Sequence, residues 1–267
     1  MATFKFGFIG VGTMGGALAR AVRKAANGEE IIVNDRSTAK AEAVARELGC
    51  VVGSGCEVAR NAQFIFLGVK PQVMKEMLSD ITEVLTARTD RFVLVSMAAG
   101  VSIRAIREMI KANVPIIRIM PNTPVAVGEG LIQYAASDEV FMDEIGAFSN
   151  ALRCAGTVDR IEENLIDAGC AVAGCGPAYV YLFAEALADG AVACGLPRAK
   201  ALEYAARTLY GSAAMMLSTD QHPAELKDAV CSPGGTTIEG VHALEQAGFR
   251  GAVMDAVKAA YEKSLHL

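Results

Sequence analysis

Short apolar runs alternate with amphipathic segments through the first 120 or so residues of the chain. The apolar runs, rich in β-branched and aromatic residues, cover 4–9, 31–33, 64–69, 92–95 and 116–119. The segments with helical periodicity cover 15–26, 39–48, 72–85 and 103–111. Strand and helix in alternation are typical of a parallel sheet with helices on both faces. The pattern predicts an α/β fold with a Rossmann-type, doubly wound and mostly parallel sheet.

The rest of the chain has a different pattern. Two further strand-like runs, 130–135 and 157–161, flank a helical segment over 138–152 and are expected to extend the edge of the sheet. Beyond them only helical segments follow, separated by glycine and proline. We therefore predict a dinucleotide-binding Rossmann domain over 1–160. An all-helical domain, for substrate binding and dimerisation, is predicted over 161–267.

One part of the helical region is almost uniformly apolar. Residues 168–184 contain no charged side chain, and only Glu185 and Asp189 interrupt the apolar surface of the helix predicted over 178–194. A membrane span needs about 20 such residues, and Gly174 to Pro177 interrupts this run. We therefore expect a buried helix of a soluble protein, for which a second subunit is one source of cover.

Composition and charge narrow the class of protein. The chain is 52% hydrophobic with a net charge of -5, and it contains no block of like charge. Neither nucleic acid nor an anionic membrane is an expected partner, which leaves a small molecule. The seven cysteines have no zinc-type spacing and the first residues do not resemble a secretory leader. We expect reduced thiols, no metal site and a cytoplasmic protein.

A glycine turn follows the first predicted strand. Gly10, Gly12 and Gly15 have the Gly-x-Gly-x-x-Gly spacing between a strand and a helix. This context is typical of dinucleotide binding, in which the helix N-terminus holds the pyrophosphate. The residues expected to bind the cofactor here are Ile9, Gly10, Val11, Gly12, Thr13, Met14 and Gly15.

The end of the second predicted strand bears on the choice of cofactor. Asp35 lies 20 residues after Gly15, where an acid that binds the ribose 2′-hydroxyl is typical of NAD. Arg36 and Ser37 are instead suited to a 2′-phosphate. They favour NADPH as the preferred cofactor, with NADH possible.

Three further predicted strands end in residues suited to the same ligand. Ligands of open α/β sheets collect at the carboxyl ends of the strands. The residues expected there are Val69, Lys70, Pro71, Ala99 and Asn122. Lys70 is expected to contact the cofactor and is also a catalytic candidate. The amide of Asn122 is able to bond to cofactor or substrate.

A second glycine turn lies near the C-terminus. The stretch Ser232-Pro-Gly-Gly-Thr-Thr237 opens into a helix and offers several backbone N–H groups and three hydroxyls. Such a turn is an anion site, and a small carboxylate fits it. The predicted substrate residues are Ser232, Gly234, Gly235, Thr236 and Thr237. With a nucleotide turn at one end and a carboxylate turn at the other, the chain is predicted to be a reductase of a small acidic substrate.

Several motifs together resemble one enzyme family over nearly the whole chain. They are Gly7-Phe-Ile-Gly-Val-Gly-Thr-Met-Gly15, Val69-Lys-Pro71, Ser96-Met-Ala-Ala-Gly-Val101, Met120-Pro-Asn-Thr-Pro124, Gly176-Pro-Ala-Tyr179, Leu187-Ala-Asp-Gly190, Gly195-Leu-Pro-Arg198, His222-Pro223 and Lys227-Asp228 with Cys231-Ser-Pro-Gly-Gly-Thr-Thr237. In this combination the chain resembles the pyrroline-5-carboxylate reductases. The C-terminal motif is the more specific one, because many oxidoreductases share the dinucleotide turn.

The resemblance implies reduction of Δ1-pyrroline-5-carboxylate to L-proline with NADPH or NADH, the last step of proline biosynthesis. It implies that the residues Asn34 to Ser37 hold the adenosine ribose and that the Thr237 hydroxyl reaches the substrate ring nitrogen. It also implies a homodimer at least, in some members assembled into a ring of dimers, with the substrate loop facing the partner's Rossmann domain.

The chain departs from the family pattern at two places. Cys175 stands where the family often has serine, and Asn34-Asp-Arg-Ser37 differs from the commoner turn after the second strand. Two alternatives stay open on the residues alone. One is a related NADPH-dependent imine or β-hydroxyacid reductase, for which Lys227 is the lysine nearest the second glycine turn. The other is a non-catalytic nucleotide-sensing protein.

Overall fold

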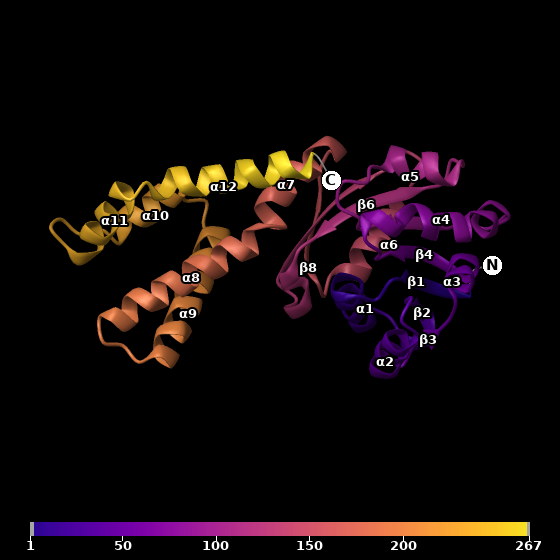
Figure 1. The fold of residues 1–267 in the computed structure, drawn as a ribbon, viewed down its shortest axis with the longest axis horizontal. Coiled ribbons are helices and arrows are strands. Elements are labelled where there is room, and N and C mark those ends of the chain that lie inside the picture. The colour runs from indigo at the N-terminus through magenta and orange to yellow at the C-terminus, as the bar shows by residue number, and fades with distance from the viewer. Residues whose placement is uncertain (1–2, 266–267) are drawn as a thin grey trace. The chain divides into compact units, whose positions relative to one another are not determined.

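The computed structural model describes residues 3–265 and divides the chain into two compact units (Figure 1). The sheet unit comprises the chain up to Cys175 together with the C-terminal segment from Tyr261 onward. The helical unit is Gly176–Ala260. The division falls after Cys175 because the first helix beyond the sheet packs on the sheet itself.

The sheet unit contains an eight-stranded sheet in the order β3-β2-β1-β4-β5-β6-β7-β8. The strands are β1 (Phe4–Ile9), β2 (Ile31–Asn34), β3 (Val51–Val52), β4 (Ala62–Leu67), β5 (Val93–Ser96), β6 (Ile116–Pro121), β7 (Gly130–Ala136) and β8 (Gly156–Arg160). Strands β3 to β6 in this order pair in parallel, β7 is antiparallel to β6, and β8 is parallel to β7. The predicted doubly wound, mostly parallel sheet and its two added edge strands are confirmed.

Helices cover both faces of this sheet. They are α1 (Thr13–Ala25), α2 (Thr38–Leu48), α3 (Gly55–Asn61), α4 (Pro71–Thr86), α5 (Ile103–Ile110), α6 (Met142–Leu152) and α7 (Ile166–Ala173), with short 3-10 turns at η1 (Gly28–Glu30), η2 (Thr123–Val127) and η3 (Glu163–Leu165). The helical unit contains α8 (Gly176–Ala193), α9 (Arg198–Ser218), α10 (Pro223–Ala229), α11 (Thr236–Gln246) and most of α12 (Phe249–Ser264).

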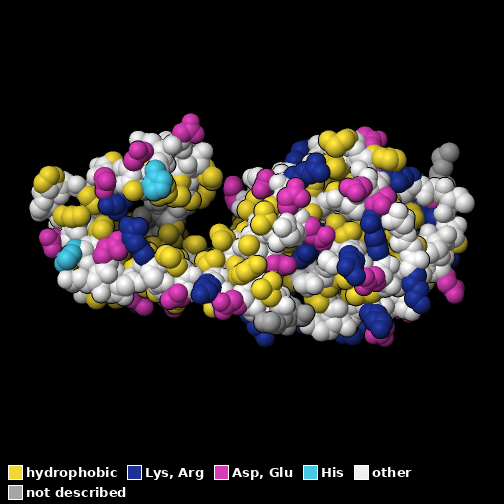
Figure 2. Space-filling model, turned by 90° about the horizontal axis from the view of Figure 1, so that it is seen from above, with side chains coloured by type: hydrophobic (Ala, Val, Ile, Leu, Met, Phe, Trp, Pro, Cys, Tyr) yellow, Lys and Arg dark blue, Asp and Glu magenta, His cyan; other side chains and the backbone are white. Residues whose placement is uncertain are grey.

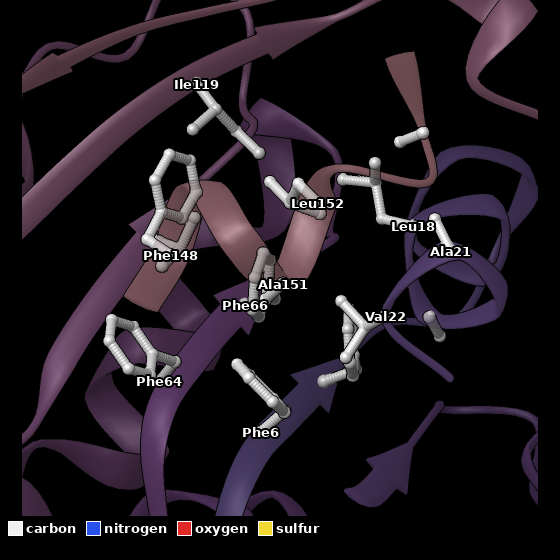
Figure 3. Close-up of a cluster of buried hydrophobic side chains, with 14 of the residues drawn as sticks. Phe6, Leu18, Ala21, Val22, Phe64, Phe66, Ile119, Phe148, Ala151 and Leu152 are labelled. Carbon is white, nitrogen blue, oxygen red and sulfur yellow. The ribbon is translucent and has the colours of Figure 1, made fainter. Parts of the chain in front are cut away.

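Two apolar cores lie on opposite faces of the sheet, because successive side chains of a strand point to opposite sides. One core joins the sheet to α1, α2 and α6 and includes Phe6, Phe66 and Phe148 (Figure 3). The other joins it to α3, α4 and α5 and includes Ile65 and Leu78. Central strands buried on both sides explain why their sequences are continuous apolar runs.

The sequence pattern missed one strand and one helix. The strand β3 has only two residues, both exposed, so it leaves no hydrophobic period. The helix α3 is a short one that begins at a capping box, in which the Ser54 hydroxyl accepts from the Glu57 amide at 3.2 Å. The Ser54 amide in turn donates to the Glu57 carboxylate at 2.7 Å. The hydrogen bond to the Ser54 backbone, together with that to its hydroxyl, lowers the pKa of Glu57.

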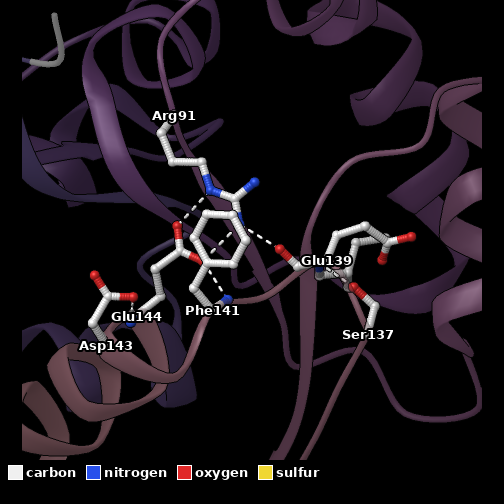
Figure 4. A network of polar contacts seen from close by, with 7 residues as sticks. Arg91, Ser137, Glu139, Phe141, Asp143 and Glu144 are labelled. Atoms are coloured by element: carbon white, nitrogen blue, oxygen red, sulfur yellow. Dashed lines mark hydrogen bonds and ion pairs between the residues drawn. The ribbon is translucent and has the colours of Figure 1, made fainter.

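A polar network holds α6 against the residues that lead into β5 (Figure 4). The Arg91 guanidinium donates to both carboxylate oxygens of Glu144, at 2.7 and 2.8 Å, and lies over the ring of Phe141. The hydrogen bond to Glu144 raises the pKa of Arg91. The buried Glu144 carboxylate also accepts from the Phe141 amide at the start of α6. One carboxylate thus both caps the helix and fixes it to the sheet unit.

The helical unit exposes much of its apolar surface. Its buried cluster consists of alanines, Ala188, Ala201 and Ala205. Large apolar side chains such as Leu182, 68% exposed, lie on its surface, and Figure 2 shows hydrophobic side chains across the helical unit. The expectation that α8 is buried is wrong for the single chain, where Ala188 is the buried residue of that helix. A helix apolar on most sides needs cover that its own chain does not supply.

One stretch among residues 3–265, Glu163–Ala193, is long and apolar enough to cross a membrane by length and composition alone. Its mean hydropathy is 1.4 and 6% of the scored window is buried. Two helices, α7 and α8, share this stretch. A single such stretch is weak support for a membrane span, because apolar helices of soluble proteins meet the same criteria.

Candidate active site

The glycine turn after β1 is held in place by close backbone contacts. Gly10 has a φ of +95°, and its amide donates to the Asn34 carbonyl at 2.8 Å. A methyl group on Gly10 would lie 2.5 Å from the Gly68 carbonyl oxygen, and one on Gly15 would lie 2.1 Å from the Gly10 carbonyl oxygen. Both positions therefore require glycine for reasons internal to the protein.

Gly12 is different from its two neighbours in the motif. A methyl group there would meet no protein atom within 4 Å, and its φ of -66° is open to any residue. No side chain caps the N-terminus of α1, and the first turn of that helix contains no acid. Free helix N–H groups beside an open glycine fit a phosphate group, which needs close approach and positive potential. The residues present thus fit the pyrophosphate of a dinucleotide.

The Asp35 carboxylate lies between the two parts of the predicted nucleotide site. One oxygen accepts from the Val11 amide in the glycine turn and the other from the Ser37 amide before α2, each at 3.0 Å. Asn34 is similarly engaged, because its side-chain amide donates to the Gly53 carbonyl at 2.8 Å. Sequence reasoning assigned Asp35 only a ligand role and missed this internal one.

The cationic candidate beside it is free to act on a ligand. Arg36 is exposed and has no ion-pair partner within residues 3–265. Ser37 is the N-cap residue of α2, and its side chain makes no capping hydrogen bond. A guanidinium, a hydroxyl and a helix N-terminus are therefore available together at this point.

The loop after β4 packs directly on the glycine turn. The Gly68 amide donates to the Ile9 carbonyl at 2.8 Å, and a methyl group on Gly68 would lie 2.3 Å from the Gly10 carbonyl oxygen. The partly exposed Val69 follows, Lys70 is the exposed N-cap residue of α4, and Pro71 begins that helix. The structure thus brings the 69–71 segment to the same edge of the sheet as the glycine turn.

Asn122 proves to hold the protein's own backbone. Its side-chain oxygen accepts from the Leu131 amide at 2.9 Å, and its side-chain nitrogen donates to the Ala173 carbonyl at 3.1 Å. The amide therefore has one free proton and one free lone pair left for a ligand. Ala99, in the loop after β5, packs against a small cluster that contains Met120.

The second glycine turn resembles the first in two features, a glycine with a positive φ and a following helix whose N-terminus no side chain caps. Gly234 has a φ of +67°, and the Gly235 amide donates to the Ser232 carbonyl at 3.0 Å. No side chain caps the N-terminus of α11, which begins at Thr236, and Thr236 and Thr237 are exposed. The turn therefore presents backbone N–H groups and hydroxyls that fit a carboxylate.

Other histidine, cysteine and lysine side chains interact with the protein itself. His222 caps α10, with Nδ1 accepting from the Ala224 amide at 3.2 Å. Burial raises the pKa of the Cys170 thiol to about 11, so it stays protonated at neutral pH. A hydrogen bond to Asp228 raises the pKa of Lys227, which keeps that ammonium charged. No group of three or more metal-ligating side chains occurs within the described part of the chain.

Two hollows of the sheet unit lie elsewhere, with volumes of about 290 and 200 Å³. The first lies where β5 and β6 begin, beside Arg88 and Pro115. The second lies beyond the ends of β7 and β8, beside Ser137 and Arg160. Neither hollow is lined by the glycine turn, so the chemistry of the chain is better judged from the helix N-termini at its two glycine turns.

Comparison with known proteins agrees with this geometry. The family model for pyrroline-5-carboxylate reductase dimerisation matches residues 163–267, and that for NADP oxidoreductase, coenzyme F420-dependent, matches residues 5–100. The chain is 42% identical to the pyrroline-5-carboxylate reductase of Escherichia coli K12 over 265 residues, which cover 97% of each chain. It belongs to the pyrroline-5-carboxylate reductase family.

Two further relatives extend the likeness across kingdoms. The pyrroline-5-carboxylate reductase of Synechocystis is 41% identical, over 99% of this chain and 98% of the relative. The crystal structure of the Plasmodium falciparum pyrroline carboxylate reductase with NADP bound has a TM-score of 0.86 at 34% identity, over 100% of this chain and 98% of that one. The fold of a pyrroline-5-carboxylate reductase thus extends over the whole chain, including the helical unit.

Proposed function

We propose that this chain reduces Δ1-pyrroline-5-carboxylate to L-proline by hydride transfer from NADPH, with NADH as a weaker donor. This reaction is the last step of proline biosynthesis. The observation that supports it best is the pair of uncapped glycine turns, one at α1 and one at α11, in a chain of this family. The first fits a dinucleotide and the second a small carboxylate.

The nucleotide is held by the sheet unit in this proposal. The turn from Ile9 to Gly15 binds the pyrophosphate through the N-terminus of α1, with Gly12 as the point of closest approach. The segment from Asn34 to Ser37 receives the adenosine ribose, where the Arg36 guanidinium pairs with a 2′-phosphate. The Val69, Lys70 and Pro71 segment, with Ala99 and Asn122, borders the inner half of the cofactor.

The substrate is held by the helical unit. Its carboxylate accepts hydrogen bonds from the backbone between Ser232 and Thr237, where Gly234 and Gly235 let an anion approach the amides. Thr236 contributes its amide and hydroxyl at the start of α11. The helix macrodipole adds attraction for a negative charge at this end of α11.

NADPH, when bound, supplies the hydride. The protonated cyclic imine is already electrophilic at carbon 5, so the protein mainly has to align the two reactants in a dry site. As carbon 5 is reduced, a lone pair develops on the ring nitrogen, and the Thr237 hydroxyl donates to this developing amine or relays a proton to it, which is general acid assistance. The Lys70 ammonium adds positive charge near the cofactor. No strong acid is required, which agrees with the absence of a histidine from the two turns.

The assembly proposed is a homodimer at least, and in its larger form a ring of such dimers. The exposed apolar side chains of α8 and α9 need cover, and the dimerisation family model matches this part of the chain. A second copy of the chain is the cover we propose, and not a lipid bilayer. We also place the enzyme in the cytoplasm, with neither nucleic acid nor membrane as a partner.

The direct test is an assay of NADPH and NADH oxidation with Δ1-pyrroline-5-carboxylate and purified protein. Rapid oxidation that yields proline, with the higher kcat/KM for NADPH, is the expected result. Oxidation with a β-hydroxyacid or another imine in its place would move the assignment to a related reductase. Nucleotide binding without turnover on any of these compounds would indicate a sensor.

A further inference from the structure

The helix α7 is seated unusually close to the sheet. Its inner face, formed by Ile166, Gly169 and Cys170, contacts β6 and β7. A methyl group on Gly169 would lie 2.1 Å from the side-chain nitrogen of Gln133 on β7. The backbone of α7 at Gly169 therefore lies directly against the Gln133 side chain, and a larger residue there would require that side chain to shift.

An ion pair between a buried arginine and a partly exposed aspartate holds the first turn of this helix. Arg118 lies in the middle of β6 with 3% of its surface exposed, and its Nη2 donates to the Asp167 carboxylate at 2.8 Å. Its Nη1 lies 3.5 Å from the Glu163 carboxylate, which also accepts from the Ile103 amide at the start of α5. The Nε of Arg118 is buried and has no hydrogen-bond partner within residues 3–265.

If Arg118 served only to pack α7 against β6, its burial would cost more free energy than it returns. Removing an arginine from water is unfavourable unless its charge is paired, and an orphan N–H adds to the cost. Apolar residues of similar volume in place of both members of the pair would hold α7 against β6 at least as stably. A charged pair adds a defined direction and register, because the guanidinium meets its carboxylate in one geometry.

The far end of α7 is attached to the site itself. The Asn122 side chain donates to the carbonyl of Ala173, the last residue of α7, at 3.1 Å. Ala99 packs against the cluster that contains Ile166, the first residue of α7. The helix therefore contacts the loop after β6 and shares a small apolar cluster with Ala99 of the loop after β5, and we place both loops beside the reacting half of the cofactor.

We propose that Arg118 and Asp167 are positioning residues for hydride transfer. By fixing the first turn of α7, they hold the loops of Ala99 and Asn122 in position beside the nicotinamide ring. Neither side chain contacts a reactant in this account, so both act through α7. The inference depends on the proposed function only for its kinetic readout.

The test compares Arg118→Met with Arg88→Met. Both arginines are buried in the sheet unit, each paired with an aspartate, with 4% of either side chain exposed. Arg88 makes its contacts away from α7, with Asp90 and with the carbonyls of Ala59 and Ala62. The control variant thus reproduces the loss of a buried charge without touching α7.

We expect Arg118→Met to lower kcat by about 10²-fold, the effect of a displacement near 1 Å at a reacting centre. The KM for NADPH should change less than about twofold, because the glycine turn and Arg36 are untouched. Amide exchange in α7 should become faster. The conservative variants Arg118→Lys and Asp167→Asn should retain more of kcat than Arg118→Met. Arg88→Met should lower the melting temperature and leave kcat unchanged.

A second variant separates positioning from stability. The double substitution Arg118→Met with Asp167→Leu replaces the pair by apolar side chains and should recover the melting temperature while kcat stays low. Full recovery of kcat in this variant, or a normal kcat in Arg118→Met, would overturn the proposal. If the wild-type protein does not reduce the substrate, the proposed function fails, and the exchange rate of α7 still decides whether Arg118 fixes that helix.

Discussion

The Asp35 carboxylate joins the glycine turn to the loop before α2, because it accepts from the Val11 amide and the Ser37 amide at 3.0 Å each. Pyrophosphate and ribose are bound on either side of this bridge in our account. The acid that is usually regarded as a mark of NAD thus has its two oxygens engaged by the protein. We therefore propose that cofactor choice at this end depends mainly on Arg36.

Replacing Asp35 by alanine should weaken both cofactors. The substitution removes two hydrogen bonds to a charged acceptor and loosens the spacing of the two loops. We expect the KM for NADH and for NADPH to rise by roughly tenfold, as the loss of about 1.4 kcal/mol predicts. Initial rates at fixed substrate would measure it. An NADPH KM that falls while the NADH KM is unchanged would show that Asp35 acts only by repelling a 2′-phosphate.

Arg36→Ala should distinguish the two cofactors. The guanidinium can pair with a 2′-phosphate that NADH lacks, so the KM for NADPH should rise by roughly tenfold and that for NADH by much less. The matched control is Arg46→Ala, an exposed arginine further along α2. Equal effects on the two cofactors would remove the basis for an NADPH preference.

Replacing Gly12 should impair cofactor binding, whereas replacing Gly15 should lower the stability of the protein. Gly12→Ala adds a methyl group that meets no protein atom, so the melting temperature should stay near that of the wild type while the KM for NADPH rises. Gly15→Ala places a methyl group against the Gly10 carbonyl oxygen and should cost about 1–3 kcal/mol of unfolding free energy. Thermal unfolding with kinetics on both variants checks this. Normal cofactor affinity in Gly12→Ala would contradict the pyrophosphate assignment.

Thr237→Ala should lower kcat by more than tenfold. General acid assistance is usually worth about 10² to 10⁴ in rate, and solvent can replace part of it. Thr237→Ser keeps the hydroxyl and should retain most of the activity. Wild-type turnover in the alanine variant would mean that the proton reaches the ring nitrogen by another route.

Apolar patterning predicted the sheet well because its central strands are buried on both faces. The strand β3 left no signal because its two residues are exposed. Burial of α8 was the expectation that failed for the single chain, since periodicity reports that a surface needs cover and not which chain provides it. The division after Cys175 depends on contacts of α7 that join distant parts of the sequence.

The two glycine turns could be located from sequence because spacing and neighbouring elements define them. The contacts that side chains make inside these turns could not be predicted from sequence. Asp35 and Asn122 were assigned to ligands by position, and both hold backbone groups in the structure. The pairing of Arg118 with Asp167 joins residues far apart in the chain and had no local pattern to reveal it.

The central claim is hydride transfer from a nucleotide held at α1 to a cyclic imine held at α11. The most direct measurement supplies NADPH deuterated at both positions of nicotinamide carbon 4, with Δ1-pyrroline-5-carboxylate, and analyses the product by mass spectrometry and NMR. The account predicts proline with a single deuteron at carbon 5. Unlabelled proline, or none despite saturating NADPH, would contradict it.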